Sequence, residues 1–431
     1  MEGTSTLIEP RTLRGFADAL PVEARRRRAL LRVIEDGFDA CGFDPIHTPA
    51  LEYAEILRGK GGEESDKQMY EFEDQGGRRV AMRFDLTVPL ARFVAEHRGR
   101  LQFPFRAYQI GPVWRGERPQ KGRYREFVQC DVDIVGSESL IADAEILNTL
   151  VFTLERLDIG EFTVRVNDRR LLNAVLGEHG LTDCATEVLR VLDKLDKVGI
   201  EAVAAELVEL GVPASDAASI VRFLSGDEDV PAAARPVMDR LDRVLELAEA
   251  AGVRHRVRLD PSIARGLDYY TGIVYETRLE TAPEIGSIAS GGRYDDLASL
   301  FTQERLPGVG ASIGIGRILG VLAEQEMALP QRPLVVITNH GGELLPMAMR
   351  IAAELRALSA IRVDVLTEDA KHSSQMKAAD RVGAALVITA REGGTVGVKD
   401  MRTGAWSDSA PDQVRTAVAD ALHLRHVECP V

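Results

Sequence analysis

The chain has 431 residues, of which 45% are hydrophobic and 28% charged, ordinary proportions for a folded protein of roughly two to four domains. It contains no apolar run near the roughly 18 residues of a membrane-spanning helix, and no secretory signal is evident at its start, so a cytoplasmic protein without a membrane partner is predicted. The net charge of −14 argues against a protein that coats a polyanion.

The first block of the chain, residues 1–168, mixes helix and strand patterns. Apolar residues at helical spacing run from Val22 to Cys41 and stop at Gly42, which is typical of a helix C-cap. Two strand patterns, FRAYQIGPVWRGE and YREFVQCDVDIVG, flank a polar stretch around RPQKGR and predict a hairpin with a basic tip. A helix over 139–157 and a strand, FTVRVND, complete the block.

Three further segments follow, and they differ in pattern. Residues 169–252 form Ala- and Leu-rich amphipathic helices without a strand pattern, which predicts a helical insertion. Strands resume in residues 253–327, which we assign to the second part of the first domain. Residues 332–431 alternate strand and helix and predict a separate α/β domain.

The strand around residues 126–135 has two chemically different faces. One face is apolar and suits a core, whereas the other carries Gln129, Asp131 and Asp133. A solvated sheet face is the plain interpretation. The hairpin before it favours a binding face, because residues 101–131 contain six basic and three acidic residues, a net +3 in an acidic chain. A basic hairpin in such a chain indicates an anionic ligand.

A Gly-rich run, GVGASIGIGRI, predicts a strand whose alternate residues from Gly310 to Gly316 expose backbone on one face. A strand face without large side chains forms a flat slot on which a planar ligand could lie, with Arg317 at the end of the slot, where it could reach a phosphate. Close packing of the sheet explains the glycines equally well. The run lacks the strand–turn–helix placement of a dinucleotide-binding loop, so that kind of site is rejected.

Three other segments could take part in binding. RGLDYYTG and SGGRYDDL each place charges and glycines near a strand, and each alone is typical of a hairpin with exposed charge. In RFDLTVPL, Asp85 could bind an amino group or could simply cap the following helix, and the local sequence does not decide between these interpretations.

Together these segments resemble the class II aminoacyl-tRNA synthetases. GFDPIHTPALEY, FRAYQIGPVWRGERPQKGRYREF and GVGASIGIGRI are similar to the three class motifs, while RGLDYYTG and SGGRYDDL resemble the two signatures of the histidyl-tRNA synthetases. The resemblance implies an α+β catalytic domain with a mixed, mainly antiparallel sheet, an all-helical insertion and a C-terminal α/β domain of the anticodon-binding type. It also implies a homodimer, because the first motif helps to form the dimer interface in this family.

The activity implied is that of a ligase. It would activate L-histidine with ATP and Mg²⁺ to histidyl-adenylate and then transfer the histidyl group to the 3′ end of tRNA(His). One alternative is a catalytically silent paralogue, the histidine-sensing regulatory subunit of ATP phosphoribosyltransferase, which generally lacks the C-terminal domain and departs from the histidine signatures. A non-catalytic tRNA-binding adaptor is a second alternative, but it would not need Arg115, Arg265 and Arg317 together.

The resemblance implies a role for each motif residue. Arg115 would grip the α-phosphate and the histidine carboxylate, and Arg265 would stabilise charge at the attacked phosphate. The histidine-binding residues would be Asp85, Thr87, Arg115, Gln129, Asp133, Arg265, Tyr269 and Tyr270. ATP would contact Arg115, Arg123 and Arg317, with Arg317 on the γ-phosphate beside magnesium, and the tRNA acceptor end would contact Arg118 and Gln120. No protein side chain is implied as a metal ligand.

The negative charge is distributed unevenly along the chain. Residues 171–250 contain seven basic and sixteen acidic residues, a net −9, whereas residues 332–431 contain twelve of each sign. The acidity therefore predicts a localised, salt-sensitive contact with nucleic acid and leaves the acidic face of the helical insertion away from phosphate.

Overall fold

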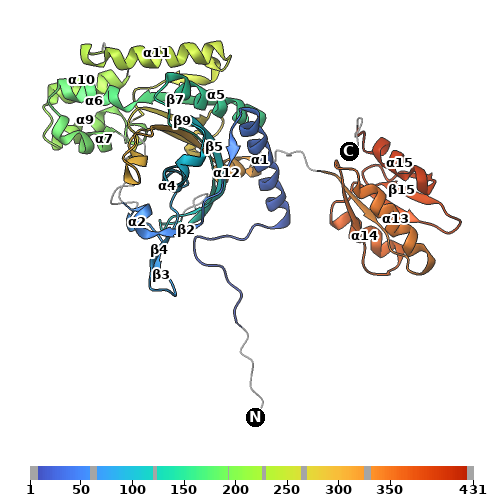
Figure 1. Ribbon diagram of the computed structural model, residues 1–431. Helices are drawn as coiled ribbons and strands as arrows, with labels where there is room; N and C mark the ends of the chain where they lie inside the picture. Colours follow the sequence, from blue (N-terminus) through green and yellow to red (C-terminus); the bar gives the residue numbers. More distant parts are fainter. Residues whose placement is uncertain are drawn as a thin grey trace. The chain divides into compact units, whose positions relative to one another are not determined.

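The computed structural model describes residues 8–58, 66–119, 124–192, 194–225, 230–263, 269–324 and 332–424. The chain divides into two compact units, residues 1–329 and 330–431, which Figure 1 shows as ribbons. Among the described residues, none of the helices has the length and apolar character needed to cross a membrane.

An eight-stranded sheet forms the centre of the first unit. In order across the sheet its strands are β1 (Asp44–Pro45), β5 (Phe105–Trp114), β6 (Glu126–Val135), β11 (Gly308–Gly314), β10 (Ser287–Tyr294), β9 (Ile273–Leu279), β7 (Phe162–Asp168) and β8 (Val257–Leu259). Only the outermost pairs, β1–β5 and β7–β8, are parallel, and the five pairs between them are antiparallel. This confirms the predicted mixed, mainly antiparallel sheet.

Three helices pack together on one face of this sheet: α1 (Pro21–Ala40), α5 (Leu140–Arg156) and α12 (Ile315–Glu324). The apolar face of β6 enters their core, where Cys130, Val132 and Ile134 are almost completely buried. The run ending in Arg317 therefore divides between two elements. Because β11 ends at Gly314, Gly316 belongs to helix α12 and not to the strand face that we predicted for it.

A small second sheet accompanies helix α4 (Thr87–His97) in the same unit. Its strands are β2 (Leu51–Tyr53), β4 (Arg79–Met82) and β3 (Glu71–Glu73), and the short helix α2 (Ala54–Leu57) packs against α4. The segment GFDPIHTPALEY is thus not one extended stretch. It supplies β1 to the large sheet and β2 to the small one, with Pro49 between them.

The helical insertion lies between β7 and β8. Its helices are α6 (Arg169–Glu178), α7 (Ala185–Leu192), α8 (Leu195–Val198), α9 (Ile200–Glu209), α10 (Ala214–Ser225) and α11 (Arg235–Ala250). Figure 1 shows them as a green and yellow layer beyond β7 and β9. Helix α11 packs along α5, and the buried side chains of the insertion belong to the same hydrophobic core as the large sheet. The insertion is therefore packed into the first unit.

The second unit is an α/β domain, as predicted. Its sheet has the order β13 (Arg362–Val365), β12 (Leu334–Ile337), β14 (Leu386–Ala390), β15 (Val396–Asp400) and β16 (Trp406–Ser409). Helices α13 (Leu345–Arg356) and α15 (Val414–Ala421) share one hydrophobic cluster, and α14 (His372–Arg381) contributes Ala379 to a second cluster with Val336 and Val387. Strand β16 was missed in the sequence because WSDS has no apolar alternation.

Candidate active site

The polar face of β6 lies in the middle of the large sheet, between β5 and β11. Asp131 is directly opposite Gln109 on one side and Ser312 on the other. Asp133 is opposite Gly310, so no side chain from β11 covers it. Because residues opposite each other in a sheet share one face, the two carboxylates and their small neighbours form a continuous floor.

A cavity of about 570 Å³ stands on this floor. Its lining includes Gln129, Asp131 and Asp133 from β6, aromatic side chains, and two arginines, Arg115 and Arg317. The volume falls within the range of pockets that hold small molecules, roughly 300–1,000 Å³. The predicted binding face of β6 is therefore hollowed, and it is not a flat solvated sheet.

The two floor carboxylates are almost completely buried, at 3% exposure for Asp131 and 4% for Asp133. Burial raises the pKa of Asp133 to about 7, although the hydroxyl of Tyr294 donates a 2.6 Å hydrogen bond that acts in the opposite direction. Burial and the neighbouring Asp133 also raise the pKa of Asp131 well above its ordinary value. A cationic ligand would relieve this cost, so the floor favours a positively charged group.

Three tyrosines form the aromatic wall of the cavity: Tyr269, Tyr270 and Tyr294. The Tyr269 ring meets the other two edge-on, with centroid distances of 5.0 Å to Tyr270 and 6.1 Å to Tyr294. The Tyr270 ring packs over Gly292, where an added Cβ would lie 3.0 Å from it. These contacts hold the wall at a fixed distance from the carboxylates.

The glycines of β11 have a different use from the predicted slot for a planar ligand. A Cβ at Gly310 would lie 1.9 Å from the Asp133 carboxylate, and one at Gly308 would lie 2.2 Å from the Tyr294 ring. The protein's own side chains therefore fill the slot at these two positions. Only its end near Gly314 stays open, since a Cβ there would meet nothing closer than the Ile288 carbonyl at 3.4 Å.

Arg115 supplies a positive charge at one end of the cavity. Its guanidinium carbon lies 4.4 Å from the Phe84 ring centre and 5.0 Å from that of Phe127, and its Nε donates to the Phe84 carbonyl at 3.2 Å. Burial lowers the pKa of Arg115, while Asp85 acts in the opposite direction. The Arg115 side chain lines the cavity, so its positive charge is placed where an anionic ligand could meet it.

Arg317 supplies a second positive charge, near the open end of the glycine slot. It is exposed in the first turn of α12 and donates to the Ser287 carbonyl. Arg118 is exposed on the hairpin stretch but does not line the cavity. Predicted site residues Gln120, Arg123 and Arg265 lie outside the described residues.

Asp85 lies one residue before Leu86, the N-cap of helix α4. Its Oδ1 accepts the backbone N–H of Val88 at 3.0 Å, and its side chain is 5% exposed. Of the RFDLTVPL residues predicted to bind histidine, Thr87 lines the cavity and Asp85 does not. Burial raises the pKa of Asp85, and Arg115 acts against this shift. The N-cap residue of α4 is Leu86, so Asp85 is not the N-cap itself, although its carboxylate serves a backbone N–H of the first turn. A direct contact with an amino group stays a prediction.

Two residues that line the cavity, Asp131 and Tyr294, were not predicted as site residues. Asp131 was visible on the polar face of β6 but was not assigned a role, although its alternation with Gln129 and Asp133 was sufficient signal. Tyr294 was not singled out either, because its partner Asp133 lies 161 residues away.

A resident metal site has little support in the side chains. Among the described residues, no group of three or more His, Cys, Asp or Glu side chains could hold a metal ion. Glu117 and Glu276 do line the cavity. Because Mg²⁺ is commonly held by one or two carboxylates together with substrate phosphates, they fit an ion that arrives with a nucleotide.

A buried anionic floor with guanidinium groups at its ends defines a protein that binds a small cationic group beside an anion. The model of the family described as Histidyl-tRNA synthetase matches residues 15–318. "Histidine--tRNA ligase" of Rhodopirellula baltica is 44% identical, covering 96% of this chain and all of that protein, and the one of Wolinella succinogenes is 42% identical, covering 96% and 98%. The histidyl-tRNA synthetase structure from Nostoc sp. PCC 7120 is 32% identical, with a TM-score of 0.86 over 96% of this chain and 100% of that one. This chain belongs to the histidyl-tRNA synthetase family.

Proposed function

We propose that the chain is a histidine–tRNA ligase, which joins histidine to ATP as histidyl-adenylate and then transfers the histidyl group to the 3′ end of tRNA(His). The observation that carries this proposal is the cavity that combines a buried carboxylate floor with Arg115. Relatives that match over nearly the full chain bear the name of this activity. The regulatory paralogue is not favoured, because the match includes the C-terminal unit that such a subunit generally lacks.

In the first step a carboxylate oxygen of histidine attacks the α-phosphorus of ATP, and pyrophosphate leaves. The two reactants are anions, so the transition state needs positive charge at the attacked phosphate. Arg115 would hold the α-phosphate and the histidine carboxylate, Arg265 would stabilise the charge that develops, and Arg317 would hold the γ-phosphate. Arg123 would add to the ATP contacts, and Mg²⁺ would enter as part of the Mg–ATP substrate.

Histidine would lie with its imidazole at Asp133 and Tyr270 and its α-amino end near Asp85, Thr87 and Gln129. The raised pKa of Asp133 supports this placement, since a ligand N–H or cation there compensates the buried carboxylate. A site that hydrogen-bonds the ring nitrogens of its substrate discriminates against analogues without those nitrogens by a factor of roughly 10⁴–10⁵ in kcat/KM. In the second step a hydroxyl of the terminal ribose attacks the acyl carbon, and AMP leaves.

Two parts of the chain would meet the tRNA. Arg118 and Gln120 would contact its acceptor end, and the second unit would read the anticodon. A cluster of rings supports this role: the half-buried His340 stacks on the exposed His372 with centroids 5.6 Å apart, and the exposed Trp406 lies 6.1 Å from His372. Arg391 also lies over the Trp406 ring, at 5.2 Å. Unpaired RNA bases bind to such combinations of rings and cations.

A homodimer through the first motif is part of the proposal. The small sheet that contains the end of this motif exposes large apolar side chains, with Leu51 at 46% and Tyr53 at 49% on β2 and Phe72 at 48% on β3. An exposed apolar patch of this kind suits a protein interface. A cytoplasmic location remains a prediction.

Exchange of labelled pyrophosphate into ATP, with and without histidine, tests the proposal. The wild-type protein should catalyse exchange only with histidine, and Arg265→Ala should reduce the rate by about 10²–10³. Absence of exchange in the wild type would show that the chain is not a ligase. Exchange that is unaffected by Arg265→Ala would leave the activity in place and remove this arginine from the mechanism.

A further inference from the structure

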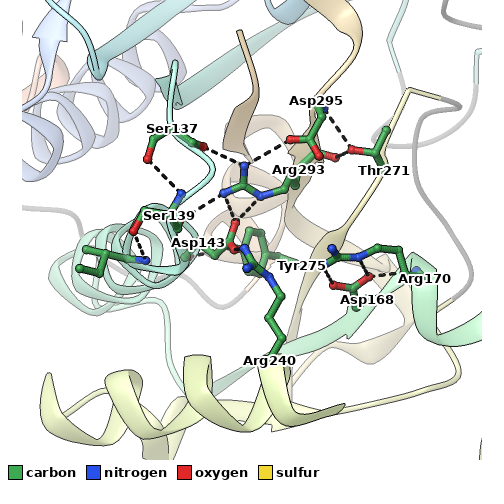
Figure 2. A network of polar contacts seen from close by, with 11 residues as sticks. Ser137, Ser139, Asp143, Asp168, Arg170, Arg240, Thr271, Tyr275, Arg293 and Asp295 are labelled. Atoms are coloured by element: carbon green, nitrogen blue, oxygen red, sulfur yellow. Dashed lines mark hydrogen bonds and ion pairs between the residues drawn. The ribbon is translucent and has the colours of Figure 1, made fainter. Parts of the chain in front are cut away.

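A buried ion cluster joins the helical insertion to β10, the strand that carries Tyr294 of the tyrosine wall. Its centre is Asp143 on α5, whose side chain has no exposure. One carboxylate oxygen, Oδ1, accepts from Nε of Arg293 on β10 at 2.8 Å, and the other accepts from Arg240 on α11 at 2.5 Å. Figure 2 shows the three side chains converging from three elements that are far apart in the sequence.

Arg293 extends this cluster to the chain around the second histidine signature. Its Nη1 donates to the Ser137 carbonyl at 2.9 Å and to Asp295 at 3.3 Å, and its side chain is 3% exposed. The hydroxyl of Tyr275 donates to the backbone carbonyl of Asp143 at 2.8 Å. The carboxylate is thus compensated by two guanidinium groups, and removal of either leaves buried charge with fewer partners.

The same arginine fixes the position of the cavity wall. Its carbonyl accepts the N–H of Thr271 at 2.8 Å, next to Tyr270, and a Cβ at Gly272 would lie only 3.2 Å from its Cδ. The residue after it is Tyr294, which bonds to Asp133 in the cavity. A shift of Arg293 would therefore move two of the three tyrosines relative to the floor.

The insertion reaches this region at its beginning as well as at its end. Arg169, the first residue of α6, donates its backbone N–H to the Gly272 carbonyl at 2.9 Å and its Nη1 to the Tyr270 carbonyl at 3.3 Å. Arg240 acts from α11, at the other end of the insertion, through Asp143. The two contacts of Arg169 fall on the short segment that carries Tyr270, whereas Arg240 contacts Asp143 on α5.

We infer that Arg240 is a positioning residue for the histidine pocket: through Asp143 and Arg293, the helical insertion sets the distance between the tyrosine wall and the carboxylate floor. The inference rests on the proposed function, because it assigns the pocket to histidine. Arg240 does not line the cavity. The cluster contacts the chain at Tyr270 and Tyr294, on the side proposed for histidine, so its effect is on the affinity for histidine and not on the affinity for ATP.

Steady-state pyrophosphate exchange with Arg240→Gln tests this, with Arg243→Gln as the matched control. Arg243 lies on the same helix, is exposed, and pairs with Glu246. Arg240→Gln should raise the KM for histidine on the order of tenfold, with the KM for ATP unchanged. Arg240→Lys, which keeps the charge, should lie between wild type and Arg240→Gln, and Arg243→Gln should match wild type.

Three outcomes separate the possible failures. If Arg240→Gln lowers only the melting temperature or the fraction of active protein, the residue is structural and the inference is wrong. The double variant Arg240→Gln/Asp143→Asn should raise the KM for histidine by a smaller factor than the product of the two single-variant factors, because both changes act through the same ion pair. A factor equal to that product would also overturn the inference. No exchange in the wild type would instead refute the proposed function.

Discussion

The two units carry their aromatic and charged groups in opposite ways. In the first, tyrosines and carboxylates are buried together, and Asp133 is 4% exposed beneath Tyr294. In the second, Trp406 is 42% exposed, its ring lies beside that of His372 in a tilted arrangement, and Arg391 and Lys399 lie over it. The first arrangement encloses a small ligand and penalises a poor fit, whereas the second offers a surface to part of a larger molecule. The predictions below test this contrast in order of expected effect.

The largest effect is expected at Arg115, the half-buried arginine of the cavity. Arg115→Ala should lower the rate of histidine-dependent pyrophosphate exchange by about 10²–10³, because it removes positive charge from the attacked phosphate. Arg106→Ala is the matched control. Arg106 lies on β5, pairs with Glu145 and stacks over Phe43, away from the cavity.

Exchange rates that fall equally in Arg115→Ala and Arg106→Ala would indicate a general loss of the sheet, and they would contradict a direct role for Arg115. A melting temperature for each variant, measured under the assay conditions, separates loss of fold from loss of chemistry.

A smaller effect is expected from the pH dependence of Asp133. Burial in the folded protein raises the pKa of this carboxyl to about 7, well above its ordinary range. The folded state therefore binds the proton more tightly than the unfolded state, so this carboxyl contributes stability at low pH that is lost as the pH rises to about 7. The Asn side chain in Asp133→Asn cannot ionise, so the variant lacks this loss. The difference in unfolding free energy, variant minus wild type, should therefore increase by on the order of 2 kcal/mol from pH 5 to pH 8.

Denaturant unfolding without ligand, followed by a probe in the first unit, measures this difference. A gap between variant and wild type that is the same at both pH values would show that the folded protein does not raise the pKa of Asp133.

The part of the site that could be predicted from the sequence depends on short-range periodicity. Alternation along β6 placed Gln129, Asp131 and Asp133 on one face because a strand repeats every two residues. No local pattern could reveal the bond between Tyr294 and Asp133, since it depends on how β10 and β11 align with β6. For the same reason the sequence did not decide between a ligand slot and close packing at the glycines of β11: what fills the space above Gly308 and Gly310 comes from other strands.

The helical insertion shows the same limit at the level of the fold. Its helices were predictable from apolar spacing, and its acidity indicated which surface would avoid phosphate. The ion cluster of Asp143, Arg240 and Arg293 was not predictable, because each charge looks like part of a solvated helix or hairpin in its own segment. Only the packing of α11 on α5 brings these charges together.

The smallest effect is expected at the exposed ring of the second unit. Trp406→Ala should raise the KM for tRNA in aminoacylation by about tenfold, as expected for loss of one stacked base, and leave pyrophosphate exchange unchanged. Trp406→Phe should retain most of the affinity because it keeps a ring. Met349→Ala, an exposed apolar residue on α13, is the control and should behave like wild type. A Trp406→Ala variant that charges tRNA normally would show that bases do not stack there, and the contrast between an enclosed and an open aromatic site would then lose its functional meaning.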